Sequence, residues 1–532
     1  MKSMSAFPSR RSMVVSTGGT VATSHPFAAQ AGLQMLAQGG TAADAVIAAA
    51  AVLNVVEPMS TGIGGDAFAL VYDAKTKGVS ALNGSGRAPH GLTRDVFHAL
   101  GHNKIPLNGV LPITVPGAVA AWQDLITAHG NLTFEQILAP AIGYARNGFA
   151  VSEIIARGWA KAEPKLRLHP DAERIFLPNG MAPTLGQRFF QPELASTFEA
   201  IVAGGAQEFY RGALAHRIVT ALARDGAFLS HADMAAHQSE WVVPAHATYR
   251  GYDVYECPPN GQGLTALIAL RMLEGFDLSQ YPPHSAQALH IQIETMRLAF
   301  ADAARYIADP AFRDVPVEAL LSDAYITPRR ALVNMKAVSP VQAGELPISN
   351  DTVYISAVDQ WGNAVSFINS LYYGFGSGVV AGDTGICMQN RGAGFVLTEG
   401  HPNALEPGKR PYHTIIPCMV TKDNALWASF GVMGGFMQPQ GHAQMLVNMI
   451  DYGMNPQEAL DAPRYELLEP YEGKKTLALE HAPDVQAALR ALGHEIVPAE
   501  VGGFGGGQII VVEDGVSYAG SDPRKDGAAV GL

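Results

Sequence analysis

Cysteine is scarce in this chain. Only three cysteines occur among its 532 residues, at Cys257, Cys387 and Cys418. They lie far apart in the sequence and show no close metal-ligand spacing. We therefore expect buried free thiols, because an unpaired cysteine usually behaves as a small apolar side chain, and we expect no metal site.

Positive charge and long apolar runs are also in short supply. The formal net charge is −12, so we do not expect a nucleic-acid partner that is held through its phosphates. The longest alanine-rich run, Ala45 to Val56, is too short to cross a membrane. The first 13 residues are basic, but Val14-Val15 gives way at once to polar residues, unlike a signal peptide. We expect a cytoplasmic protein with no membrane partner.

Several common catalytic and cofactor motifs are missing. There is no Gly-x-Ser-x-Gly elbow of a serine hydrolase and no His-Glu-x-x-His of a zinc peptidase. Two glycine clusters, 374–378 and 502–507, superficially suggest dinucleotide loops. The second precedes a strand pattern rather than a helix, whereas a Rossmann loop must open a helix, so no nucleotide cofactor is expected.

What the chain does have is a hairpin pattern with a threonine at its open end. Asp359 and Asn363 can close a three-residue loop whose last member, Gly362, supplies a left-handed conformation. This register places Thr352 opposite Ser370 on the same face. From the hairpin alone, a structural threonine-serine pair across two strands is the favoured interpretation over a reactive hydroxyl.

Helix and strand signals alternate in the first portion, and strands dominate the second. A proline at a first helical position and a following Gly-Gly predict a helix over 26–38, and a capping box predicts a buried helix from Thr41 to before Pro58. A third helix is expected over 284–306. The expected strands are 241–243, 254–255, 415–416, 425–428 and 508–512.

A set of short motifs then identifies the chain as similar to the gamma-glutamyltranspeptidase family of N-terminal nucleophile hydrolases. The motifs span nearly the whole sequence and are Ala22-Thr23-Ser24-His25-Pro26, Asn54-Val55-Val56-Glu57-Pro58, Thr61-Gly62-Ile63-Gly64-Gly65, Pro258-Pro259-Asn260-Gly261-Gln262-Gly263, Lys409-Arg410-Pro411, Gly431-Val432-Met433-Gly434-Gly435 and Ser521-Asp522-Pro523-Arg524. The resemblance implies an α+β fold, a four-layer αββα sandwich of two stacked sheets between helical layers.

The resemblance also implies that the chain cuts itself between Asp351 and Thr352. A hydroxyl is a weak nucleophile without a base beside it, and a freed α-amino group with a pKa near 8 can be that base. The products would be a large subunit, residues 1–351, and a small catalytic subunit, residues 352–532, within one interlocked unit. A dimer of such units is compatible with the sequence.

Four residues match the family's catalytic positions. Thr352 matches its nucleophile and Ser370 a hydroxyl that positions it. Gly434 and Gly435 match the pair whose backbone N–H groups stabilise the oxyanion, a preorganised donor set that amide cleavage needs. Without the resemblance, an ordinary Gly-Gly turn would explain these glycines equally well.

At the substrate positions the chain departs from the transpeptidases. Ser85 replaces their carboxylate-binding arginine, while Arg87 lies two residues later. Arg391 and Gly394 replace the amino-group ligands. Gaining a guanidinium and losing a carboxylate disfavours an α-amino substrate and suits a planar carboxylate. The other candidate substrate contacts are His413 and Thr414, in place of paired serines, and Tyr372, in place of an asparagine.

These departures resemble the acylase and amidohydrolase branch of the family, which includes glutaryl-type acylases and oxamate amidohydrolase. We therefore expect hydrolysis of a small amide that bears a carboxylate, with no cofactor. A gamma-glutamyl hydrolase or transpeptidase is the nearest alternative. An uncleaved, non-catalytic binding protein is a third, and either arginine could instead be a structural ion-pair partner.

Overall fold

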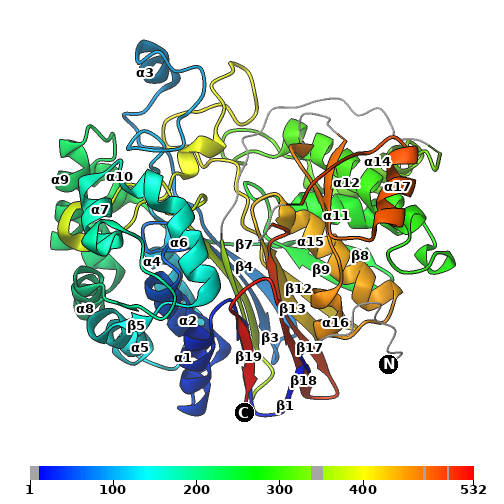
Figure 1. The fold of residues 1–532 in the computed structure, drawn as a ribbon, viewed down its shortest axis with the longest axis horizontal. Helices are drawn as coiled ribbons and strands as arrows, with labels where there is room; N and C mark the ends of the chain where they lie inside the picture. The colour runs from blue at the N-terminus through cyan, green and yellow to red at the C-terminus, as the bar shows by residue number, and fades with distance from the viewer. Residues whose placement is uncertain (1–10, 337–351, 471–474, 500–502) are drawn as a thin grey trace.

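The computed structural model describes residues 11–336, 352–470, 475–499 and 503–532. Two seven-stranded antiparallel sheets lie face to face in the middle of the molecule, with helices on both outer sides (Figure 1). The α+β, four-layer αββα arrangement expected from the resemblance is therefore confirmed.

Both sheets mix strands that are distant in sequence. The first sheet has the order β1 (Val14–Ser16), β18 (Val516–Ser521), β17 (Gly506–Glu513), β13 (Ala425–Met433), β12 (Cys418–Lys422), β9 (Tyr252–Glu256) and β8 (Ala245–Tyr249). The second has the order β19 (Ala528–Gly531), β2 (Thr20–Thr23), β10 (Val353–Val358), β11 (Ala364–Ser370), β3 (Asp66–Asp73), β4 (Gly78–Gly84) and β7 (Glu240–Val242). The residues on the two sides of Thr352 thus contribute strands to both sheets.

One helical layer covers the second sheet, on the left of Figure 1. It contains α1 (Pro26–Ala37), α2 (Ala42–Val56), α4 (Ala118–His129), α5 (Phe134–Asn147), α6 (Glu153–Leu166), α7 (Pro170–Phe176), α8 (Pro192–Tyr210), α9 (Ala213–Arg224) and α10 (His231–Ala236). The short α3 (Arg94–Ala99) projects at the top. The small pair β5 (Phe149–Ala150) and β6 (Arg188–Phe189) joins this side.

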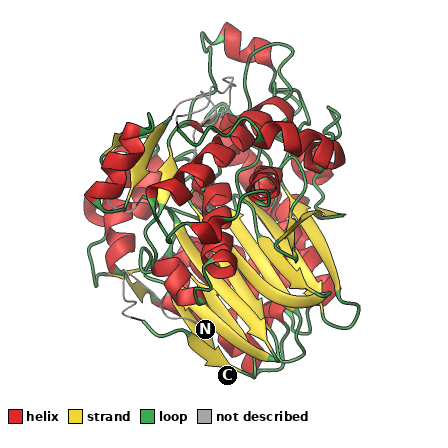
Figure 2. Cartoon of the chain, turned by 90° about the vertical axis from the view of Figure 1, so that its right-hand side faces the viewer, coloured by secondary structure: helices red, strands yellow, loops and turns green. Residues whose placement is uncertain are grey.

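The other layer covers the first sheet. It contains α11 (Gly263–Leu273), α12 (Ala286–Tyr306), α13 (Val317–Leu321), α14 (Asp323–Arg330), α15 (Met437–Leu446), α16 (Pro456–Asp461) and α17 (Pro483–Ala491). A three-stranded sheet of β14 (Tyr465–Leu467), β15 (Thr476–Leu479) and β16 (Glu495–Val497) accompanies α17. Figure 2 shows the strands of the sandwich running side by side beneath helices.

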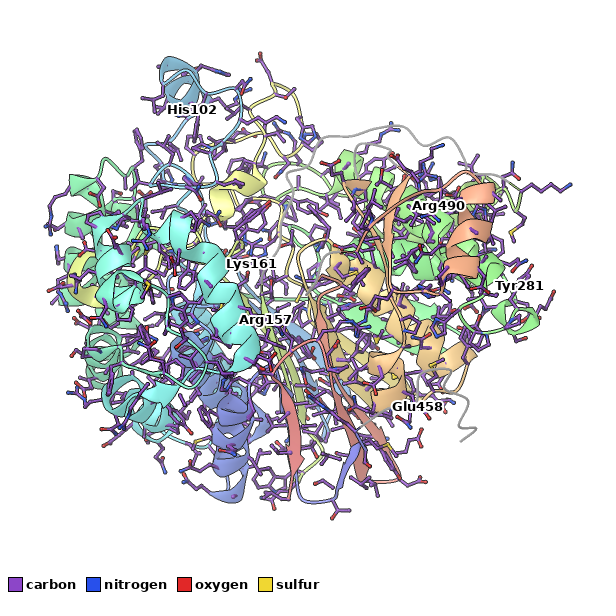
Figure 3. The ribbon with its side chains drawn as sticks, in the orientation of Figure 1. His102, Arg157, Lys161, Tyr281, Glu458 and Arg490 are labelled. Atoms are coloured by element: carbon purple, nitrogen blue, oxygen red, sulfur yellow. The ribbon has the colours of Figure 1, made fainter. Side chains whose placement is uncertain are left out.

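Three apolar cores hold the four layers together. Phe68, Tyr354, Ile368, Met419 and Ile510 belong to the core between the two sheets, and each outer face has a core of its own against its helices. Burying apolar surface at about 25 cal/mol per Å² is the main driving force for such stacking. Charged side chains labelled in Figure 3, Arg157 and Lys161 on α6 and Arg490 on α17, lie on the outer surfaces of the helical layers.

The helices expected from the sequence are confirmed. Thr41 and Asp44 form the capping box of α2, and all 15 residues of that helix are buried. Helix α12 begins at Ala286, two residues after the predicted start at 284, and Ser285 is its N-cap. Helix α1 begins at Pro26 as expected. No helix within the described residues is long and apolar enough to span a bilayer.

The strand predicted at Ile415-Ile416 is wrong. These residues are buried but precede β12, which begins at Cys418. Their backbone N–H groups donate to side chains, Ile415 to His413 Nδ1 at 3.4 Å and Ile416 to Gln438 Oε1 at 2.9 Å. Because these amides are used outside a ladder, an apolar, β-branched pair does not become a strand.

Candidate active site

The hairpin built from β10 and β11 has the predicted register. Val353 pairs with Asn369, so Thr352 lies opposite Ser370 at the open end. The loop is closed by Asp359 and Asn363, whose backbones bond at 3.0 Å, and Gly362 adopts φ +84°. Asp351, the predicted residue before the cut, lies outside the described residues. Local turn chemistry therefore sets the threonine against the serine.

Thr352 is 1% exposed and its hydroxyl meets that of Ser370. Thr352 Oγ1 donates to Ser370 Oγ at 3.3 Å. The backbone N–H of Tyr372 donates to the same serine oxygen at 2.8 Å, and Tyr372 has φ +87°, an uncommon value for a residue with a side chain. Such backbone geometry persists where the surroundings enforce it, and here it directs an N–H group at Ser370.

Arg391 lies next to this pair of hydroxyls and bonds to that of Ser370. It is fully buried; its Nη1 donates to Thr414 Oγ1 at 2.8 Å and its Nη2 to Ser370 Oγ at 3.3 Å. The guanidinium carbon stands 4.1 Å from the centre of the Tyr372 ring, a cation–π contact. Burial lowers the pKa of Arg391 to about 10, so the side chain stays charged at neutral pH. The structure thus brings together five predicted site residues: Thr352, Ser370, Tyr372, Arg391 and Thr414.

His413 is next to Thr414 in the chain, and its ring contacts Asp66, a residue for which the sequence predicted no role. The two nitrogens of the His413 ring have different partners. Its Nδ1 accepts the Ile415 N–H and its Nε2 lies 3.0 Å from Asp66 Oδ2, which identifies Nε2 as the protonated nitrogen. Burial lowers the pKa of His413 to about 3, so the ring is neutral. Both ring nitrogens therefore have protein partners, and the ring orients Asp66.

Asp66 is a fully buried carboxylate at the start of β3. Besides His413 it accepts the N–H groups of Gly86 and Gly117, both at 3.0 Å, and Gln389 Nε2 at 2.9 Å. Burial alone would raise the pKa of Asp66, but the hydrogen bonds from His413 and Gln389 and the charge of Arg391 outweigh burial and lower it, so Asp66 is ionised. The one available signal was its place directly after the Thr61 to Gly65 motif.

The predicted oxyanion pair connects to the same cluster. Gly434 and Gly435 have φ +111° and +56°, conformations that favour glycine. Gln262 links this pair to Thr414, one of the predicted substrate contacts, because its Nε2 donates to the Gly435 carbonyl at 2.9 Å and to the Thr414 carbonyl at 2.6 Å. Gln262 was part of a recognised motif but had no predicted role.

Arg87 occupies a different environment. Its guanidinium lies 3.2 Å from Glu240 and 3.5 Å from Asp309 and donates to the Gly408 carbonyl at 3.1 Å. The side chain is 32% exposed. Its charge is thus balanced by carboxylates, the ion-pair arrangement left open at the sequence level, whereas Arg391 makes no ion pair with a carboxylate among the described residues.

Chemically, this geometry combines a threonine hydroxyl, a second hydroxyl that holds it, a buried cation and a Gly-Gly turn. An ordinary structural Thr-Ser pair would not explain the neighbouring guanidinium, because a guanidinium buried without a direct ion pair is costly. The arrangement suits attack on an amide carbonyl by Thr352 with an anionic group bound nearby.

Comparison with known proteins agrees with this geometry. The family model described as gamma-glutamyltranspeptidase matches residues 28–532. The chain is 41% identical to the glutathione hydrolase-like YwrD proenzyme of Bacillus subtilis, over 98% of this chain and 99% of that protein. It is 35% identical to the oxamate amidohydrolase proenzyme of Klebsiella pneumoniae, over 97% and 99%.

A solved structure shows the same likeness in three dimensions. The cephalosporin acylase from Bacillus halodurans superposes with a TM-score of 0.93 and 44% identity, covering 100% of this chain and 99% of its own. Sequence and structure agree over the full length, and the two curated relatives are proenzymes. The chain therefore belongs to the gamma-glutamyltranspeptidase family of N-terminal nucleophile hydrolases.

Proposed function

We propose that this protein is a self-processing amidohydrolase with Thr352 as its nucleophile. In the precursor, Thr352 Oγ1 attacks the carbonyl of Asp351, and water hydrolyses the resulting ester. The freed α-amino group of Thr352 then acts as base for the same oxygen. Gly434 and Gly435 supply backbone N–H groups to the oxyanion, and Ser370 holds the nucleophile. The buried Thr352 to Ser370 hydrogen bond supports this assignment.

The two products of that cut would remain one body. Residues 1–351 supply β2, β3, β4 and β7 to the second sheet, and residues 352–532 supply β10, β11 and β19. Thr352 precedes β10, a central strand between β2 and β11, so the new amino terminus would stay fixed by pairing on both sides.

We further propose that the substrate is a small amide bearing a carboxylate, such as oxamate or a glutaryl amide. The observation that carries this choice is Arg391, a buried guanidinium one hydrogen bond from Ser370. Its Nε has no hydrogen-bond partner among the described residues, so part of its donor capacity is unused. A carboxylate would use that capacity and balance the charge.

The gamma-glutamyl alternative needs an acidic partner for the substrate ammonium group. Asp66 is the carboxylate nearest in the network, but His413, Gly86, Gly117 and Gln389 already donate to it. Three of these donors bond to Oδ1, so an ammonium group would have to share Oδ2 with His413 and would lie beside the Arg391 cation. Both requirements disfavour an α-amino substrate.

The test compares matched variants on matched substrates. Cleaved enzyme is offered oxamate, a glutaryl amide and a gamma-glutamyl amide, and release of ammonia or amine is measured. The gamma-glutamyl compound should be the poorest. Arg391→Ala should lower kcat/KM for the favoured substrate by about 10- to 100-fold, since a charge-assisted contact contributes roughly 1.5 to 3 kcal/mol.

Arg87→Ala is the control. Because Glu240 and Asp309 already balance that charge, Arg87 has little capacity to bind a substrate carboxylate, and kcat/KM should stay within about threefold of wild type. Preference for the gamma-glutamyl amide, or equal effects of the two arginine variants, would contradict the Arg391 assignment and favour the transpeptidase alternative.

A further inference from the structure

A second buried polar cluster lies on the opposite face of the first sheet from the inter-sheet core. Glu256 ends β9, Cys418 begins β12, and the two are direct cross-strand partners. His442 reaches them from α15, which covers that face. Each of the three residues is 0% exposed, and one ligand atom from each lies within 4.8 Å of the others.

The hydrogen bonds of this cluster are incomplete. His442 Nδ1 lies 2.7 Å from Glu256 Oε1, and Cys418 bonds to the same carboxyl group. Glu256 Oε2 and His442 Nε2 have no hydrogen-bond partner among the described residues. Leaving a buried polar atom unpaired is costly, so two such atoms in one cluster indicate a missing partner.

From this geometry we infer that Glu256, Cys418 and His442 form a binding site for a divalent transition-metal ion, with zinc the best fit. One thiolate, one imidazole and one carboxylate are all ligands that zinc accepts, and a mixed set containing sulfur disfavours calcium or magnesium. Three protein ligands leave one position of a tetrahedral ion for a water molecule.

Charge balance supports a metal in this dry environment. A thiolate, a carboxylate, a neutral imidazole and Zn²⁺ together carry no net charge. Binding is expected to release protons to solvent, because a thiol or a carboxyl group must be deprotonated to act as a metal ligand.

The metal site would stabilise the backbone segments that carry the proposed catalytic groups. The residues before β12 include His413 and Thr414, and α15 starts two residues after Gly435. A metal joining β9, β12 and α15 would therefore restrain α15, which follows the Gly434-Gly435 turn, and β12, which pairs with the strand β13 that leads into the turn. This bracing role rests on the proposed function, whereas the metal site does not.

The experiment is a metal analysis of the full-length protein, purified without a metal-affinity column. Elemental mass spectrometry of wild type grown with added zinc should find about one zinc per chain after gel filtration. Protein produced with cobalt should show a sulfur-to-cobalt charge-transfer band in the near ultraviolet. Wild type that folds yet contains less than about a tenth of an equivalent, with no such band, overturns the inference.

Variants locate the ligands. Cys418→Ser and the near-isosteric Glu256→Gln should each lose at least about tenfold in bound metal. Cys257→Ser is the matched control, because Cys257 is an adjacent buried thiol that faces the inter-sheet core, where its Sγ bonds to the Ala69 carbonyl. Metal retained in Cys418→Ser, or lost equally in Cys257→Ser, refutes the ligand set. Should the Cys418 variant not fold, the cobalt band of wild type still decides, and neither readout depends on turnover.

Discussion

Ser370→Ala should separate catalysis from folding. The serine hydroxyl meets Thr352 Oγ1, the Tyr372 N–H and Arg391 Nη2. Its removal leaves two buried N–H donors without this acceptor, so the free energy of unfolding should fall by about 1 to 3 kcal/mol. The nucleophile also loses the group that holds it and aligns the guanidinium, which should lower kcat by roughly 10- to 100-fold, or about 1.5 to 3 kcal/mol.

Ser366→Ala provides the matched control on the same strand and the same face. Ser366 is also 0% exposed, and its hydroxyl lies 2.6 Å from that of Tyr354. Truncating it should cost a similar amount of stability, about 1 to 3 kcal/mol, without touching the nucleophile.

The assay combines thermal unfolding, the time course of precursor cleavage on denaturing gels, and kcat of the cleaved enzyme. Both variants should melt at similar temperatures, but only Ser370→Ala should mature and turn over slowly. Equal rates in the two variants would show that the Ser370 hydroxyl is structural, and the positioning role would have to be abandoned.

Three further perturbations test other parts of the structure. Thr352→Ala should abolish both self-cleavage and turnover because one oxygen performs both, while Thr352→Ser should retain some of each; an alanine variant that still splits before residue 352 would contradict the assignment. Gly431→Ala should destabilise the protein by about 1 to 3 kcal/mol, measured by urea unfolding, because a Cβ at this position would come 2.5 Å from the Tyr354 ring. The control is Gly143→Ala on α5, where a Cβ would enter open space, and this variant should be neutral or stabilising. Burial lowers the pKa of His284 to about 4 and of His481 and His494 to about 3, below the unfolded value of about 6.5. The unfolded chain therefore binds more protons in this range, so stability should fall as pH drops from about 7 toward 4, and His481→Leu should flatten the dependence of melting temperature on pH; an unchanged slope would argue against this histidine.

Parts of this architecture were predictable because they depend on short stretches of chain. The capping box of α2, the proline start of α1 and the Asp359 to Asn363 loop are local devices, and the loop alone set Thr352 against Ser370. The strand predicted at Ile415-Ile416 failed because its N–H groups bond to the side chains of His413 and Gln438, the second of which is far along the chain.

Some residues that the sequence made equally good candidates for substrate binding are distinguished by neighbours that are distant in the chain. Arg87 and Arg391 both suit a carboxylate, but Glu240 and Asp309 balance the first while the second lies behind Ser370 and Thr414. Asp66 and Gln262 lie beside or within recognised motifs, but the sequence assigned neither a role, because their partners His413 and Gly435 are far away along the chain.

The sequence by itself determined the family and the hairpin and predicted the place of the proposed nucleophile, because motifs and turns are contiguous and their geometry follows from neighbouring residues. Only the tertiary structure decided which cation lies beside that nucleophile, which carboxylate orients His413, and that Glu256, Cys418 and His442 meet. Sheet pairing and helix packing bring such residues together across long separations, and burial then fixes their charge, which no local pattern encodes.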